Sequence, residues 1–166
     1  MKTYLLLLIG IIFCLTSCKK DKDKKPVARL DIFECKVNGQ LWLPEVSNAW
    51  IENKLESSYQ SGVFSVSARK KRGLPNPISE KIYYSGYFFT TGEYELTGWP
   101  HDMSFSKILD NSLHIFRTDS LHTGKVTITK VDTVAGIIAG TFYFDAIDTT
   151  TNEVVHITEG KFDVKY

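Results

Sequence analysis

The chain has 166 residues, and its 20 Lys and Arg against 19 Asp and Glu give a formal net charge of +1. Apolar residues make up 43% of the chain and charged residues 23%, which is typical of a globular protein and excludes a disordered or collagen-like chain. The balanced charge excludes a strongly basic nucleic-acid binder, so we expect no nucleic-acid partner. The three cysteines are too few for a disulfide-dense scaffold.

The N-terminal segment is typical of an export signal. Lys2 supplies a positive charge, and residues 5–15 form an uncharged stretch. This stretch is too short to cross a bilayer, because a spanning helix needs about 20 apolar residues. Residues 15–18, Leu-Thr-Ser-Cys, resemble the lipobox of bacterial lipoproteins. The resemblance implies removal of a signal peptide of residues 1–17 and acylation of Cys18, which would anchor the protein in a lipid bilayer. An ordinary secretory signal with a chance cysteine is the alternative.

Residues 18–29 are expected to form a lipidated tether. Residues 19–25 consist only of Lys and Asp, which is typical of a solvated linker. Its positive charge would draw it to an anionic membrane surface, although solubility and reach also account for it. Residue 19 is Lys, whereas an Asp at this position of Gram-negative lipoproteins tends to retain them at the inner membrane. The Lys and Asp residues directly after Cys18 also resemble the export tethers of surface lipoproteins in Bacteroidota-type bacteria. We therefore expect an outer-membrane lipoprotein with a periplasmic or surface-exposed domain.

Residues 30–166 are expected to form a single all-β domain. About ten short strands with polar turns between them indicate an antiparallel β-sandwich, with a lipocalin-like β-barrel as the alternative. Asn38-Gly39 predicts a type I′ hairpin, and residues 45–56 are the only segment for which a helix is an alternative. The clearest expected strands are residues 30–37, 40–43, 63–69, 82–89, 93–96, 112–118, 125–131, 137–147 and 154–166.

The last three of these strands are expected to form an antiparallel meander. In the final strand the apolar positions change from odd numbers, Val155 and Ile157, to even numbers from Phe162 onward. Such a change needs one extra residue, so the pattern predicts a β-bulge near Glu159-Gly160, where Gly tolerates a positive φ.

Cysteine counting leaves one thiol in the mature chain. Cys14 is lost with the signal peptide and Cys18 is acylated, so Cys35 has no partner for an intrachain disulfide. Cys35 shares a strand face with Phe33 and Val37, which favours a core residue over a nucleophile.

The strand and turn motifs resemble those of a family of small Bacteroidota lipoproteins of unknown function. The resemblance rests on residues 37–42 (Val-Asn-Gly-Gln-Leu-Trp), 124–129, 138–146 and 155–162, and covers most of residues 30–166. These motifs imply a shared fold, and they carry over no catalytic residue.

Candidate chemistry is sparse. The four histidines are scattered, and His101-Asp102, in an expected exposed loop, is the most interesting pair. Asp132, Asp145 and Asp148 lack the spacing of an EF-hand, so turn chemistry is the favoured interpretation. The chain contains neither a Gly-Xaa-Ser-Xaa-Gly elbow nor a phosphate-binding Gly loop. We therefore expect no enzyme, metal site or cofactor.

Two charged features are expected on the surface. Residues 69–72, Arg-Lys-Lys-Arg, form a basic cluster in an expected loop. A solvated loop is the favoured interpretation, with anionic glycans or lipid head groups as alternative partners. Glu93 and Glu95 share a strand face, which usually marks a solvated surface.

Aromatic residues, 13% of the chain, give the strongest hint of binding. Trp50, Tyr87 and Trp99 lie at loop edges or on strands of mixed character, and we hypothesise that they form an exposed strip that binds a glycan or an envelope protein. A core or edge-shielding role is the favoured interpretation of the aromatic residues as a group. The favoured function is a non-catalytic binding or scaffold module. The alternatives are a barrel that carries a small apolar ligand and an envelope hydrolase.

Overall fold

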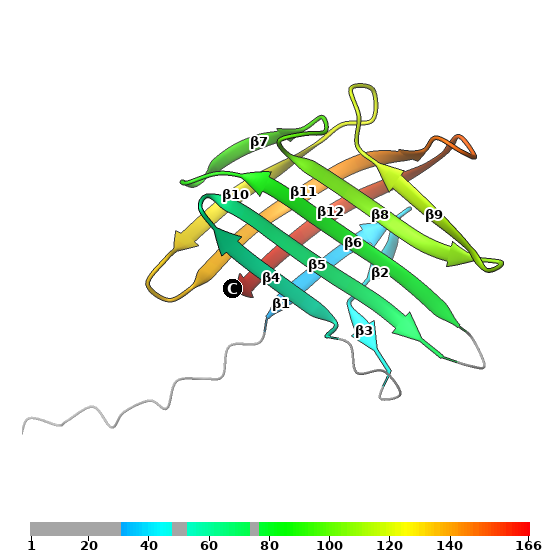
Figure 1. Ribbon diagram of the computed structural model, residues 1–166, viewed down its shortest axis with the longest axis horizontal. Helices are drawn as coiled ribbons and strands as arrows, with labels where there is room; N and C mark the ends of the chain where they lie inside the picture. The colour runs from blue at the N-terminus through cyan, green and yellow to red at the C-terminus, as the bar shows by residue number, and fades with distance from the viewer. Residues whose placement is uncertain (1–30, 48–52, 74–76) are drawn as a thin grey trace, which may run out of the picture.

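The computed structural model describes residues 31–47, 53–73 and 77–166, which form twelve β-strands (Figure 1). Within these residues there is no helix that could span a membrane. The strands are β1 (Ile32–Val37), β2 (Gln40–Trp42), β3 (Glu45–Val46), β4 (Leu55–Gln60), β5 (Val63–Arg72), β6 (Ile78–Tyr87), β7 (Gly92–Leu96), β8 (Asp102–Leu109), β9 (Ser112–Arg117), β10 (Gly124–Asp132), β11 (Ile137–Asp148) and β12 (Glu153–Lys165).

The strands are arranged in two layers that cross in Figure 1. Layer A has the order β2-β1-β12-β11-β10-β7, and layer B has the order β9-β8-β6-β5-β4, with β3 running parallel to the end of β5. All other pairings are antiparallel, and one bridge between Ile147 and Arg117 joins the layers. The sheet does not close into a barrel, so the expected all-β sandwich is confirmed and the barrel alternative is not supported.

Aromatic side chains fill the space between the layers. Phe64 of layer B is completely buried and lies 5.7 Å, between ring centroids, from Phe162 of layer A. Phe142 contacts both Phe33 and Phe162. Close packing of this kind leaves the apolar interior occupied by the protein's own side chains. The core residues predicted from alternation are buried: Phe64, Val66, Ala68, Val126, Ile128, Ile138, Phe142, Phe144, Ala146, Val155, Ile157, Phe162 and Val164.

The three C-terminal strands form the predicted meander, with a bulge where it was expected. The register between β11 and β12 shifts between the pairs Phe142–Gly160 and Phe144–Ile157. The residue with the positive φ, however, is Glu159, at 52°. Gly160 is required for another reason, because the ring of Phe142 occupies the space that a Cβ atom would need. The position of the bulge is confirmed, but the expected reason for the glycine is wrong.

Most of the other strand predictions are confirmed. Asn38 and Gly39 both have positive φ, 48° and 81°, as a type I′ turn requires. The number of strands exceeds the expected ten because β3, β4 and β8 form where no clear strand was expected. Residues 45–56 have strand at both ends, and positions 48–52 between them lie outside the described residues.

The loop predicted for residues 69–72 is wrong. These residues continue β5 and pair with β6 as far as Arg72 and Ile78. Four consecutive basic residues fit a strand here because both faces supply anions. Arg72 donates to Glu45 at 2.6 Å, and Arg69 lies 2.8 Å from Glu56.

Candidate functional site

An apolar cluster projects from the outer face of layer B, where β6 leaves the sheet. Tyr87 pairs in register with Val63, and both side chains are exposed. Phe89 follows β6, is 60% exposed, and places its ring against Gly62. The rings of Tyr87 and Phe89 are 5.1 Å apart and perpendicular, at 88°. We call Val63, Tyr87 and Phe89 the aromatic knob.

Trp99 lies in the turn between β7 and β8 and is 85% exposed. This turn is closed by a hydrogen bond from the backbone N–H of His101 to the carbonyl of Gly98. Tyr87 and Trp99 are therefore on the surface, as the binding hypothesis requires. Trp50, the third member of the predicted strip, lies outside the described residues, and so does Cys18.

His101 and Asp102 do not form the exposed pair expected from the sequence. Asp102 is the first residue of β8 and His101 immediately precedes it. Successive side chains along an extended segment point to opposite faces. The ring of His101 packs on Tyr94, with 4.9 Å between ring centroids, and burial lowers its pKa. Asp102 accepts a hydrogen bond from Thr118, and burial raises its pKa. The two groups therefore have no common proton to exchange.

Cys35 is a core residue, as predicted. It is 1% exposed and a free thiol. Burial raises its pKa to about 12, and the negative charges of Glu34 and Glu80 add to this effect. A thiol this weakly acidic is protonated at neutral pH and is not a nucleophile.

A row of charged residues crosses layer B at the opposite end of β6. Lys70 pairs with Glu80, Glu80 with Lys107, and Lys107 with His114, so the four lie side by side on four neighbouring strands. Each is two residues beyond a fully buried core side chain on its own strand, and so faces the space between the layers. The core residues concerned are Ala68, Ile82, Phe105 and Phe116. We call Lys70, Glu80, Lys107 and His114 the charged row.

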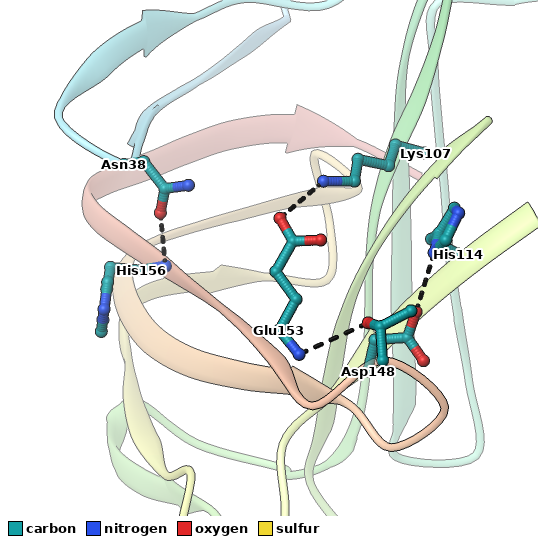
Figure 2. A network of polar contacts seen from close by, with 7 residues as sticks. Asn38, Lys107, His114, Asp148, Glu153 and His156 are labelled. Atoms are coloured by element: carbon teal, nitrogen blue, oxygen red, sulfur yellow. Dashed lines mark hydrogen bonds and ion pairs between the residues drawn. The ribbon is translucent and has the colours of Figure 1, made fainter. Parts of the chain in front are cut away.

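Three members of the charged row are bridged to the other layer. The indole Nε1–H of Trp42 donates to Glu80 at 2.7 Å. Lys107 donates to Glu153 at 2.8 Å, and His114 lies 2.9 Å from Asp148 (Figure 2). These bridges satisfy polar groups that the apolar interior would otherwise leave unpaired.

Asp148 is the most buried acid of this network. It is 4% exposed and accepts a hydrogen bond from the backbone N–H of Thr150 at 2.9 Å. That bond and the contact with His114 lower its pKa, so it stays ionised near neutral pH. Asp132 likewise accepts from the backbone N–H of Ala135, which confirms turn chemistry for these two residues.

Three of the histidines are paired with aspartates, which the sequence analysis did not predict. His114, His122 and His156 each contact an aspartate through Nδ1, at 2.9, 3.0 and 2.8 Å. The first pair is the least exposed of the three, and its partners are 34 residues apart in the chain. Within the described residues no group of three or more His, Cys, Asp or Glu side chains could hold a metal ion.

The charged row could be found only in part from the sequence. In each strand, a charged residue or a histidine occupies the inward position next to the last buried apolar one. That signal was available, but the pairing of β6 with β8, which are not consecutive, was not. The solvated surface predicted for Glu93 and Glu95 is confirmed, because both remain exposed and share Lys125.

Comparison with known proteins places this fold in a family. A model described as a domain of unknown function, DUF6252, matches residues 31–164. The chain belongs to this family. The matched range of the DUF6252 domain begins one residue before β1 and ends within β12, so it includes both the aromatic knob and the charged row. No curated protein and no solved structure matches the chain.

Proposed function

We propose that this chain is an outer-membrane lipoprotein, acylated at Cys18, whose DUF6252 domain is a non-catalytic module that binds another envelope protein through the aromatic knob. The observation that carries the proposal is the exposure of Tyr87 and Phe89 beside each other on a sheet. Apolar clusters that remain exposed on a folded domain usually mark interaction surfaces. Trp99 supplies a further exposed aromatic side chain outside the knob.

The geometry of the knob favours a protein partner over a glycan. A sugar ring stacks on a flat aromatic face, and two rings form one platform only when they are nearly coplanar. Tyr87 and Phe89 are perpendicular, so together they form a protrusion. Aromatic protrusions are typical anchors for a pocket on a partner protein.

The packing of the interior favours binding at the surface over transport of an apolar ligand inside the domain. Tyr84, Phe64 and Phe144 are each at most 1% exposed and occupy the space between the layers. An apolar ligand would have to displace these side chains, and each displaced aromatic group would lose about 2–3 kcal/mol of burial.

The membrane anchor is tested by replacing Cys18 with Ala. We expect the variant to lose incorporation of labelled palmitate and to leave the membrane fraction, or to accumulate as an uncleaved precursor. Cys14→Ala is the matched control, because that thiol would be removed with the signal peptide, and its palmitate labelling and fractionation should match the wild type. A Cys18→Ala chain that is still acylated would refute the anchor.

The partner surface is tested by photo-crosslinking in intact cells. A benzophenone amino acid at position 89 should give one discrete protein adduct, and Tyr87→Ala in the same chain should reduce its yield at least tenfold. The same probe at Val134, which is 98% exposed in the β10–β11 turn, should give no such adduct. Equal labelling at both positions, or an adduct that contains only carbohydrate, would contradict a protein partner at the knob.

A further inference from the structure

We propose that the charged end of the domain binds a small zwitterion, of the size of a free amino acid or a dipeptide, between Lys70 and Glu80. This site is separate from the aromatic knob and does not depend on the partner proposed above. The proposal rests on Lys70, which among the described residues is the member of the charged row without a bridge to layer A.

Lys70 is the member of the charged row without a bridge. Glu80, Lys107 and His114 each contact a residue of layer A. Within the part of the chain that the structure describes, Lys70 makes no hydrogen bond or ion pair, although its side chain is half-buried. A cation in such a position is stabilised by an anion, so Lys70 has capacity for a carboxylate from outside the chain.

Glu80 has a complementary open position. One carboxylate oxygen accepts from Trp42, and the other accepts no hydrogen bond from any described residue. Lys70 and Glu80 are in register on neighbouring strands, yet they form no ion pair within 4.0 Å. Among the described residues, the Lys70 ammonium group and one Glu80 carboxylate oxygen therefore have no partner, and they lie on neighbouring strands. Their complement is a molecule with a carboxylate and an ammonium group.

A pocket lies between these two side chains. Its volume is about 270 Å³. That volume is below the roughly 300–1,000 Å³ of sites for drug-sized ligands, so it suits a single amino acid or a dipeptide. Its lining residues are Val37, Asn38, Gln40, Leu41, Trp42, Lys70, Glu80, Phe105, Lys107 and Val155.

The lining explains how such a ligand would be oriented. Lys70 and Lys107 flank Glu80 on either side, so a carboxylate would lie toward Lys70 and an ammonium group toward Glu80. Phe105 and Val155 supply apolar surface for a short side chain. A simple anion would be repelled by Glu80, and a simple cation would be repelled by Lys70. A zwitterion can place its opposite charges beside both side chains.

The test is calorimetric titration of the full-length chain, purified as the cell produces it. The probes are the common free amino acids and alanyl-alanine, together with the N-acetylated and C-amidated forms of each. We expect saturable binding of at least one free zwitterion, and at least tenfold weaker binding of both of its blocked forms. Lys70→Met and Glu80→Gln should each weaken binding of the free form at least tenfold.

The variants are chosen to preserve the fold. Lys70 has no partner to lose in the part of the chain that the structure describes, and Gln at position 80 retains an oxygen that can accept from the Trp42 indole. The control is Lys81→Met, which removes the same charge from the outer face of β6 beside Glu80 and should leave binding unchanged. Absence of saturable binding by every free probe would overturn the proposal, and so would binding that neither Lys70→Met nor Glu80→Gln weakens.

Discussion

The two ends of layer B are built from the same strands but present opposite chemistry. At one end of β6, Glu80 points into the space between the layers and is part of the charged row. At the other end, seven residues and roughly 23 Å along the strand, Tyr87 points outward with Phe89. In Figure 1 the charged end lies where β5 ends and β8 meets β9, and the aromatic end lies where β6 ends.

The two ends therefore contribute to the stability of the domain in different ways. Polar groups that face the interior are stabilised by partners, because an unpaired buried group costs about 1–3 kcal/mol. The charged row is therefore tied to the other layer by three bridges. Apolar groups that face solvent need no partner for the domain to fold, so the aromatic knob is free to serve a contact outside the chain.

The largest expected effect comes from the core that both ends share. Gly160→Val should lower the free energy of unfolding by about 3 kcal/mol, because the new side chain would overlap the ring of Phe142. Gly73→Val, where no atom lies within 4 Å of an added Cβ, should change it by less than about 0.5 kcal/mol. Chemical denaturation measures both values, and equal stabilities would contradict the close approach of Gly160 and Phe142.

The next effect separates a buried bridge from an exposed one. Asp148→Ala would leave His114 without its partner and the Thr150 N–H without its acceptor, and we expect the melting temperature to fall by roughly 5 °C. The matched control is Asp145→Ala, since Asp145 makes a similar contact with His156 but half of its side chain is exposed. If both variants melt at the same temperature, the bridges of the charged row do not stabilise the domain.

The aromatic end should show its own dependence on pH. Burial lowers the pKa of His101 below its ordinary value of 6.5. Below pH 6.5 the unfolded chain therefore binds more protons at His101 than the folded chain does. The free energy of unfolding decreases as the pH falls from 6.5 to the pKa of His101 in the folded chain. In His101→Gln this part of the decrease between pH 7 and 5 should disappear. An unchanged pH profile of stability would place His101 in a solvated setting.

The aromatic knob accounts for the smallest expected change in stability. Tyr87→Ala should alter the free energy of unfolding by about 0.5 kcal/mol or less, because the side chain is 46% exposed. The same variant should reduce the yield of the crosslink from position 89 at least tenfold. A large loss of stability with no effect on the crosslink would mean that Tyr87 is a structural residue.

Local patterns predicted much of the fold. Alternation identified the buried faces of the meander, and a change of parity located the bulge at Glu159. The end of β5 was predicted as a loop because residues 69–72 are four consecutive charges. The ion pair of Arg72 with Glu45, which lies 27 residues away in β3, could not be predicted from the local pattern. The charged row was missed for the same reason, since it requires the register of four strands at once.

The most direct test of two separate sites uses the tryptophans as reporters. The Trp42 indole N–H donates to Glu80 at the charged end, and Trp99 is exposed in the turn before β8. In a spectrum of the full-length chain with ¹⁵N-labelled indoles, a free zwitterion that binds should shift the Trp42 signal and leave the Trp99 signal in place. Movement of Trp99 without Trp42, or no movement of either signal on saturation, would contradict the account.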